Sequence, residues 1–404
     1  MGHFYRTALI AAVLATLPCQ AASQAILTED IFLAALGEDH PAIIALSDRL
    51  SAAEGARAGA GRLANPRLAA AWELPEETTQ QETWSVAWTP PLDGRRGLRV
   101  RASEAALDAA KADFEAAELE TRVAMRAVFA EWAISAERRA IVAAHHESVA
   151  RLVAQMSARA KSGEASGLSA RRLALAELEI EASLARAAAD EASARQRAAA
   201  WSAIAESASP ARPDLPEAPA DVDVSAKPQI RARESELAAA EYDKRLAGRF
   251  LEFPELEAGW QKQEDVADET FSGPVFGASW PLPLFDRQQG DRAQTNRRVV
   301  AAQARLDFAK TLANAEVDAT RDAYVTLRES ALRSIAAIAE TDVLIEGATA
   351  SYTLGESDLT DLLETLRSVL AARMAALDLY EAALEAHRDL ELAVGRPLSS
   401  GGGQ

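Results

Sequence analysis

The chain has 404 residues and a formal net charge of -18, from 43 Lys and Arg against 61 Asp and Glu. So acidic a chain is a poor general binder of nucleic acid, which requires basic patches, whereas an acidic surface favours capture or passage of cations. The only cysteine is Cys19, which excludes a disulfide framework.

The first residues of the chain predict a secretory signal peptide over 1–25. A positive charge precedes an apolar segment at 8–17, which is too short to span a bilayer as a helix. Small residues follow, and cleavage is expected after Ala21 or Ala25. Lipid attachment to Cys19 is disfavoured because a proline precedes it.

The rest of the chain presents one pattern twice. The recurring anchors are Pro41 with Pro228, 52–54 with 239–241, 66–68 with 254–256, Trp72 with Trp260, Trp88 with Trp280, 91–92 with 283–284, 97–99 with 290–292, and 163–164 with 355–356. A unit of this length is not a solenoid repeat of about 20–50 residues. We therefore expect a duplicated half-molecule, with repeats at 26–207 and 229–397, a Pro-rich linker at 208–228 and a disordered tail at 398–404.

Each repeat predicts a helix, a strand pair, a very long helix, a turn and another long helix. The runs without Gly or Pro are 98–162, 168–209, 291–346 and 356–394. These runs far exceed the roughly 8–20 residues of ordinary globular helices, so they predict long antiparallel coiled-coil helices. The breaks at 163–167 and 355–357 predict tight turns, with Ser357 or Asp358 able to cap the next helix. No other stretch approaches the roughly 18 consecutive apolar residues of a transmembrane helix.

Strand signals occur in four short segments with alternating side chains, at 67–74, 83–90, 255–261 and 275–282. One apolar face of these segments carries Trp72, Trp84, Trp88, Trp260 and Trp280. Polar, acidic stretches at 75–82 and 262–269 join the two strands of each pair. This alternation is typical of transmembrane barrels, and we expect the five tryptophans to face lipid. The alternative is a soluble four-stranded sheet that covers a helical bundle; the tryptophans and the signal peptide favour the barrel.

Four strands cannot close a barrel, since about eight is the smallest number that does. The chain must therefore contribute part of a barrel and associate with copies of itself.

This layout resembles the TolC family of outer-membrane efflux ducts over about residues 27–397. The segment YTLGE at 352–356, followed by DLTDLLE at 358–364, is similar to the second helical turn of that family. The segments AWTPPL at 87–92 and SWPLPLFDRQQG at 279–290 are similar to the strand-to-helix passages of its CzcC-like heavy-metal branch.

The resemblance implies a mostly α fold with a small β part: long antiparallel coiled-coil helices plus four transmembrane strands per chain. It implies a homotrimer in the outer membrane, with a shared 12-stranded barrel (three chains of four strands) and an α-helical periplasmic tunnel. The implied partners are outer-membrane lipid, an inner-membrane RND-type transporter and a periplasmic adaptor (membrane fusion) protein. The adaptor would dock at Gly163, Glu164, Gly355 and Glu356. The implied function is passive conduction, without cofactor or catalysis.

The resemblance also implies a constriction at the periplasmic tip. By matching motif, Asp361 and Glu364 occupy two acidic ring positions and Tyr352 is the tyrosine at which the turn begins. Asp361 and Glu364 are three residues apart, so they share a helix face, and threefold symmetry would make a ring of inward acids that attracts cations. Glu364 is Asp in the best-known members. Without the family match, a solvated helix face is the preferred interpretation of both acids.

Two arginine clusters follow the second and fourth strands. Their members are Arg95, Arg96, Arg99 and Arg101, then Arg287, Arg292, Arg297 and Arg298. Two interpretations remain open for both clusters: contact with anionic lipid head groups, and ordinary helix-surface charge.

Nothing in the sequence indicates an enzyme or a metal site. His145 and His146 point about 100° apart on a helix, so a structural or solvent role is expected for them. No Gly-rich phosphate loop, serine triad or zinc spacing occurs. The preferred function is the outer-membrane exit duct of a tripartite RND-type efflux system, with heavy-metal cations as a candidate substrate that the sequence does not fix. The alternatives are an exit duct for type I protein secretion or drug efflux, a periplasmic adaptor, which needs much more β structure, and a soluble helical scaffold.

Overall fold

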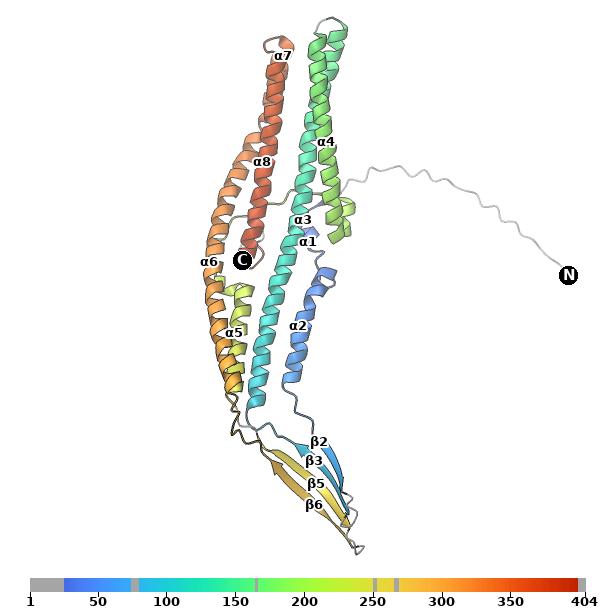
Figure 1. Ribbon diagram of the computed structural model, residues 1–404. Coiled ribbons are helices and arrows are strands. Elements are labelled where there is room, and N and C mark those ends of the chain that lie inside the picture. Colours follow the sequence, from blue (N-terminus) through green and yellow to red (C-terminus); the bar gives the residue numbers. More distant parts are fainter. Residues whose placement is uncertain (1–24, 74–79, 164–165, 250–252, 265–268, 399–404) are drawn as a thin grey trace, which may run out of the picture.

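The computed structural model describes residues 25–73, 80–163, 166–249, 253–264 and 269–398. The molecule is long and narrow, with two helical hairpins at one end, packed helices in the middle and a four-stranded sheet at the other end (Figure 1). The predicted signal peptide, apart from Ala25, lies outside the described residues, as do Cys19, Glu164 and all but Leu398 of the predicted tail.

The elements follow the predicted order twice. The first half contains β1 Ala25–Leu27, α1 Glu29–Leu33, α2 Pro41–Ala60, β2 Arg67–Glu73, β3 Gln80–Trp88, α3 Arg95–Lys161 and α4 Gly167–Trp201. A 3-10 turn at Ala203–Glu206, β4 Ala208–Pro210 and a second 3-10 turn at Val224–Ala226 lead to the second half. That half contains α5 Pro228–Ala247, β5 Glu255–Glu264, β6 Thr270–Ser279, α6 Gln289–Ile338, α7 Thr341–Leu354 and α8 Leu359–Val394.

Helix α3 is the longest helix that the structure describes, and it contacts helices of both halves of the chain. It spans 67 residues, which corresponds to about 100 Å at 1.5 Å per residue. The small side chains of Ala105, Ala109, Ala112 and Ala116 are buried at spacings of three and four. They form one narrow face, and α2 and α5 both contact α3. Small residues at this spacing allow neighbouring helices to approach closely.

Helix α4 ends at Trp201, earlier than its Gly/Pro-free run predicts. The Trp201 ring stacks on the His40 ring at 5.9 Å, and Ser202 takes an extended conformation at φ -151°. The chain then reaches β4, which pairs in parallel with β1, so that Ala25 lies opposite Ala208. These are contacts between distant segments, and no local residue pattern signals them.

The second long helix is interrupted at Ala339 and Glu340, although neither Gly nor Pro is present. The Thr341 hydroxyl donates to the Ile338 carbonyl at 2.7 Å. Arg373 of α8 donates to the Thr341 hydroxyl at 3.0 Å. A side-chain hydroxyl that donates a hydrogen bond to a helix carbonyl is a known cause of a bend or kink in the helix. The break therefore depends on a contact from α8 as well as on the local sequence.

The sheet has the order β2-β3-β5-β6 and is antiparallel throughout. The β3–β5 pair joins the two halves of the chain and sets Trp84 opposite Trp260. Strands β3, β5 and β6 extend further into the polar connections than predicted, because backbone ladder bonds do not depend on side-chain polarity. The ladder between β3 and β5 thus includes Gln80 opposite Glu264. β3 and β6 end earlier than predicted, and proline, which lacks the N–H for a ladder bond, follows each of them.

The interior is a series of small clusters along the length of the molecule. Phe32, Phe129 and Trp132 centre the first cluster, with ring separations of 5.2 and 6.0 Å. Others surround Tyr324 in the middle and Leu362 near the hairpin end. Among the described residues, no helix is both long and apolar enough to cross a membrane.

The Pro-rich linker is held on the helices by side chains that bind its carbonyl oxygens. Tyr324 of α6 donates to Pro216 at 2.5 Å and Tyr380 of α8 donates to Pro213 at 2.6 Å. Burial raises the pKa of both tyrosines, so they act here as neutral donors. The linker is thereby a fixed part of the middle of the molecule.

Candidate functional site

The sheet has one apolar, aromatic face. The register places Trp72, Trp84, Trp88 and Trp260 on the same side, and the Trp72 and Trp84 rings meet edge to face at 5.5 Å. Trp280 follows β6 directly. The side chains of Trp72, Trp84, Trp260 and Trp280 are about half exposed in the single chain. The structure therefore brings four of the five predicted lipid-facing tryptophans onto one sheet face.

Small and polar residues make up most of the opposite face of the sheet, apart from Val275 and Phe271 of β6. On β3 this face is less exposed than the aromatic face. Ser85 is buried on it, although its neighbours Trp84 and Val86 are exposed. A Cβ atom at Gly259 would lie 2.5 Å from the Trp84 carbonyl oxygen. Gly259 is therefore a close-approach position at which any side chain would clash with β3, a constraint that alternation along the strand does not reveal. Gln261, on the same face, is the better position at which to test this side of the sheet.

Arginines at the junction of sheet and helices bind the carboxyl ends of helices. Arg96 donates to the Gly61 carbonyl at the end of α2, at 2.7 Å. Arg292 donates to the Ala247 carbonyl at the end of α5, at 3.4 Å. Arg95 binds the Arg249 carbonyl through Nε at 2.8 Å. Cations at this end of a helix satisfy free carbonyls and complement the helix dipole. Arg95, Arg96 and Arg292 thus have structural roles.

The far end of the molecule carries the two helical turns. Helix α7 ends at a Schellman motif in which Gly355 has φ 79°, and Glu356 N–H donates to the Ser351 carbonyl at 2.9 Å. Asp358 then caps α8 by accepting from Asp361 N–H at 2.9 Å. In the other hairpin, Gly163 has φ 81° after α3. Glycine suits both positions because a positive φ disfavours other residues.

Tyr352 packs inward between the two hairpins. Its hydroxyl lies 3.4 Å from the Met156 sulfur of α3, and its ring contacts the cluster that contains Leu173, Leu359 and Leu362. Within one chain, Tyr352 therefore joins the second hairpin to the first.

Asp361 and Glu364 are both exposed, on the side of α8 opposite its buried residues Leu362 and Leu366. The Asp361 carboxylate also accepts from Asp358 N–H at 3.4 Å, which completes a capping box. The two acids share a face that the rest of the chain does not cover, as a lumen-facing or a solvated position requires. Their role as a constriction stays a prediction.

A cleft of about 550 Å³ lies between α3, α7 and α8, next to the helix break. Arg373 crosses it and binds Asp342 at 2.6 Å. His145 of α3 is buried at its wall, and burial together with Arg373 lowers the pKa of this histidine. His146 is half exposed, so the adjacent histidines do not converge. Among the described residues, no three His, Cys, Asp or Glu side chains come together as metal ligands do.

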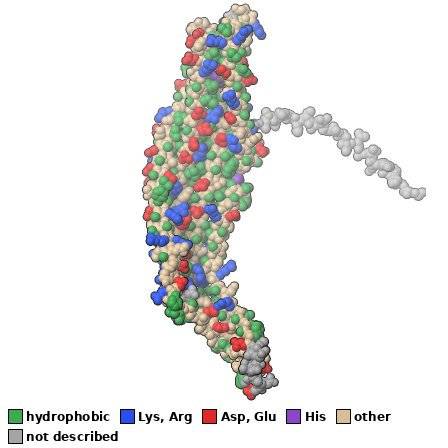
Figure 2. Space-filling view, in the orientation of Figure 1, with side chains coloured by type: hydrophobic (Ala, Val, Ile, Leu, Met, Phe, Trp, Pro, Cys, Tyr) green, Lys and Arg blue, Asp and Glu red, His purple; other side chains and the backbone are tan. Residues whose placement is uncertain are grey.

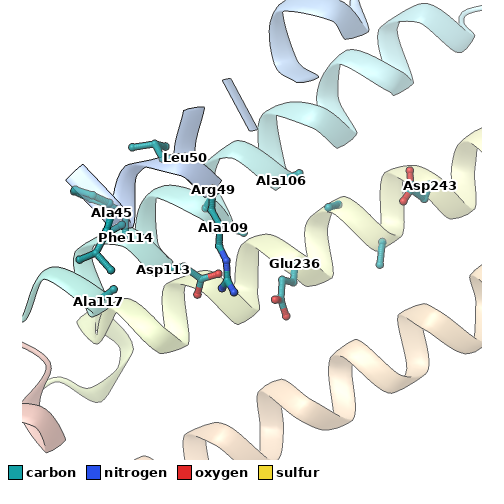
Figure 3. Close-up of a pocket in the computed structure, with 14 residues that line it drawn as sticks. Ala45, Arg49, Leu50, Ala106, Ala109, Asp113, Phe114, Ala117, Glu236 and Asp243 are labelled. Atoms are coloured by element: carbon teal, nitrogen blue, oxygen red, sulfur yellow. The ribbon is translucent and has the colours of Figure 1, made fainter. Parts of the chain in front are cut away.

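A groove of about 700 Å³ lies between α2, α3 and α5 (Figure 3). Alanines form much of its wall, and Figure 3 shows Arg49 reaching toward the carboxylates of Asp113 and Glu236. Burial raises the pKa of Asp243, which also lines the groove, against the opposite effect of Arg298. Charges of both signs thus face this space.

The structure also reveals a buried ion cluster that the sequence analysis missed. Arg126 of α3 binds Glu391 of α8 and lies 2.8 Å from Glu29 of α1. Glu391 is fully buried, and Leu398 N–H donates to it at 2.7 Å. Burial raises the pKa of Glu29, while Arg126 opposes that shift. The sequence signal for this cluster is an arginine, Arg126, within an apolar stretch of α3. Its partners Glu29 and Glu391 are far away in the sequence, so the sequence alone does not pair them with it.

Comparison with curated proteins finds a relative that is similar along most of the chain. The chain is 24% identical over 372 residues to the cobalt-zinc-cadmium resistance protein CzcC of Cupriavidus metallidurans, covering 87% of this chain and 86% of the relative. No model of a known protein family matches the chain.

Solved structures of outer-membrane proteins have the same fold. The outer-membrane protein VceC of Vibrio cholerae matches with a TM-score of 0.72 at 18% identity, over 91% of this chain and 96% of VceC. CusC matches with a TM-score of 0.73 at 13% identity, over 98% and 99%. The MtrE channel of Neisseria gonorrhoeae in its open state matches with a TM-score of 0.67 at 17% identity, over 92% and 89%. The predicted fold of the chain, mostly α with a small four-stranded β part, is confirmed, and the similarity to CzcC agrees with the resemblance to the CzcC-like branch of the TolC family.

Proposed function

We propose that this chain is the outer-membrane channel of a tripartite RND-type efflux system, and that it passively conducts heavy-metal cations from the periplasm to the outside. The observation that carries the proposal is the shape of the single chain. It combines long helical hairpins with an open sheet that has exposed aromatic residues on one face. Solved structures of outer-membrane channels share this arrangement along nearly their whole length.

The open sheet supports assembly into a trimer. Its edge strands β2 and β6 have unpaired backbone groups on their outer sides within the described chain. Such edges are stable in a membrane only if they pair, because lipid offers no hydrogen bonds. Three copies would join β6 of each chain to β2 of the next, and 12 strands are enough for a closed barrel. The aromatic face would then meet outer-membrane lipid, and the face of Ser85 and Gly259 would line the lumen.

The helical end supports the predicted route through the periplasm. Arranged about a threefold axis, Asp361 and Glu364 would bring six carboxylates to the tip, which would favour cations. The turns at Gly163 and Gly355 would be available to a periplasmic adaptor, and an inner-membrane RND-type transporter would supply energy. Conduction of this kind requires neither a cofactor nor a catalytic group.

The relative's name indicates the substrate class. CzcC is a cobalt-zinc-cadmium resistance protein, and an acidic tip in a chain of net charge -18 suits divalent cations. The test is deletion of the gene in its own host, followed by measurement of tolerance to cobalt, zinc and cadmium. We expect a loss of tolerance that the wild-type chain restores. Unchanged metal tolerance, with a defect in drug tolerance or protein secretion instead, would assign the channel to another substrate.

A further inference from the structure

A basic belt surrounds the junction between the helices and the sheet. The segments at this level are 61–67, 92–101, 244–249 and 284–298, and together they contain thirteen Lys and Arg against three Asp. The chain as a whole has the opposite balance, 43 bases to 61 acids. Figure 2 shows Lys and Arg side chains gathered at the end of the helical body nearest the sheet. The belt is thus a local reversal of the charge of the molecule.

Some residues of the belt bind the backbone of neighbouring helices, and the others are exposed on the surface. Arg95, Arg96 and Arg292 bind backbone carbonyls, as described above. The other exposed members are Arg62, Arg67, Arg99, Arg101, Lys244, Arg245, Arg249, Arg287, Arg297 and Arg298. Two of the three aspartates already have partners, since Asp93 lies 3.4 Å from Arg95 and Asp286 accepts from Gln288 N–H. Acids just outside these segments engage three further members, since Arg67 pairs with Glu255, Arg245 lies 3.8 Å from Glu241, and Arg298 lowers the pKa of Asp243 against the effect of burial. The members that form no ion pair within the described residues are Arg62, Arg99, Arg101, Lys244, Arg249, Arg287 and Arg297, so about half of the belt's positive charge is available.

Exposed apolar side chains lie directly beside this charge. They occupy the connections between the helices and the strands, and they are Leu63, Leu92, Leu282, Leu284 and Phe285. Phe285 is 92% exposed and Leu92 is 72% exposed. Large apolar groups next to arginines are the composition of a membrane–water interface, where the apolar groups enter the acyl region and the cations reach the phosphates.

We propose that this belt binds the anionic phospholipid head groups of the periplasmic leaflet and so fixes the depth of the sheet in the membrane. The inference rests on the proposed function, because it takes the sheet as the membrane-inserted part. Arg287, Arg297 and Arg298 lie in or just before the first turns of α6, and Arg99 and Arg101 lie in the first turns of α3. Their guanidinium groups bind phosphate oxygens, while Leu284 and Phe285 enter the acyl region below them.

The test uses the sheet's own tryptophans as reporters. The full-length protein is reconstituted into bilayers of phosphatidylcholine and phosphatidylglycerol, with bromine on the acyl chains of only one lipid. Bromine quenches the fluorescence of nearby tryptophans, so the two labellings compare how often each lipid contacts the sheet. We expect phosphatidylglycerol to be preferred by roughly twofold to fivefold at low salt, and the preference to approach 1 near 1 M salt, where screening is strong.

The two possible failures are distinct. Absence of quenching by either brominated lipid would contradict the proposed function, since the sheet would not be in the bilayer. Equal quenching by both lipids at low salt would overturn the proposal that the belt binds anionic head groups, and it would leave the proposed channel function intact.

Variants locate the effect. R287Q/R297Q/R298Q should lower the preference toward 1. The matched control R171Q/R172Q/R186Q removes the same charge from exposed positions on α4 and should retain the wild-type preference. Equal loss in both variants would mean that net charge, not the belt, attracts the lipid, and retention in both would also overturn the proposal. If the first variant does not assemble, R99Q/R101Q and the salt dependence of the wild type decide the question.

Discussion

Removal of Arg126 should destabilise the protein far more than removal of a comparable arginine on the same helix. Arg126 and Glu391 have side chains that are 10% and 1% exposed, and Glu29 is 19% exposed. Arg126→Met would leave the Glu391 carboxylate buried without its cation, which costs about 3–5 kcal/mol. Arg138 also binds two carboxylates, of Asp378 and Glu381, but these are 64% and 43% exposed. Arg138→Met should therefore cost roughly 1 kcal/mol or less.

The assay is thermal unfolding in detergent, followed by tryptophan fluorescence at one fixed heating rate. Trp132 is 1% exposed and lies under two turns from Arg126, so it reports on this region. At about 2 °C per kcal/mol for a large domain, the apparent midpoint should fall by roughly 6–10 °C in Arg126→Met and by about 2 °C or less in Arg138→Met. Because a buried ion pair replaced by apolar residues is often nearly neutral, R126M/E391M should recover most of the loss. Equal effects of the two single variants, or no recovery in the double variant, would refute this reasoning.

Three further predictions concern the sheet, the middle and the tip. Trp260→Arg should impair assembly by about 2–4 kcal/mol, because its face meets mid-bilayer lipid in this account, whereas Gln261→Arg on the opposite face should assemble. The measurement is the yield of trimer in the outer membrane, and the reverse ranking would invert the proposed orientation of the sheet. His387 is buried, and burial lowers its pKa to about 4. Because the unfolded chain binds the proton first, the free energy of unfolding should be highest above about pH 6.5 and should decrease by up to about 3 kcal/mol as pH falls to 4, partly offset by the raised pKa of Glu29. In measurements of unfolding against pH, His387→Gln should not show this decrease. Replacing Asp361 with Asn and Glu364 with Gln should weaken block by multivalent cations and reduce cation selectivity in single-channel recordings, with assembly retained; unchanged recordings would place these acids outside the lumen.

The sequence predicts the elements of this fold well where the signal is local. Runs without Gly or Pro predicted α3 nearly to its ends, and alternation around Trp84 and Trp260 placed both on one sheet face. Gly355 and Asp358 form the expected turn and cap. In each case, neighbouring residues determine the backbone conformation, so a short window of sequence is sufficient.

What the sequence did not predict depends on residues far apart in the chain. The end of α4 lies where Trp201 stacks on His40, and the break between α6 and α7 involves Arg373. The closeness of Gly259 to Trp84 comes from strand register, which the alternation alone does not fix. The sequence predicts even less of the candidate site, because the helix face that carries Asp361 would contact other chains only in an assembly.

The sheet edges and the aromatic face together make one arrangement central to this account: three chains that share one barrel. The most direct measurement is a single-particle cryo-electron microscopy reconstruction of the full-length protein extracted from outer membranes. The account predicts threefold symmetry, a closed barrel in which β6 of each chain pairs with β2 of the next, and a continuous helical tunnel below it. A monomer whose sheet folds back over its own helices, or an assembly in which β2 and β6 remain unpaired, would contradict it.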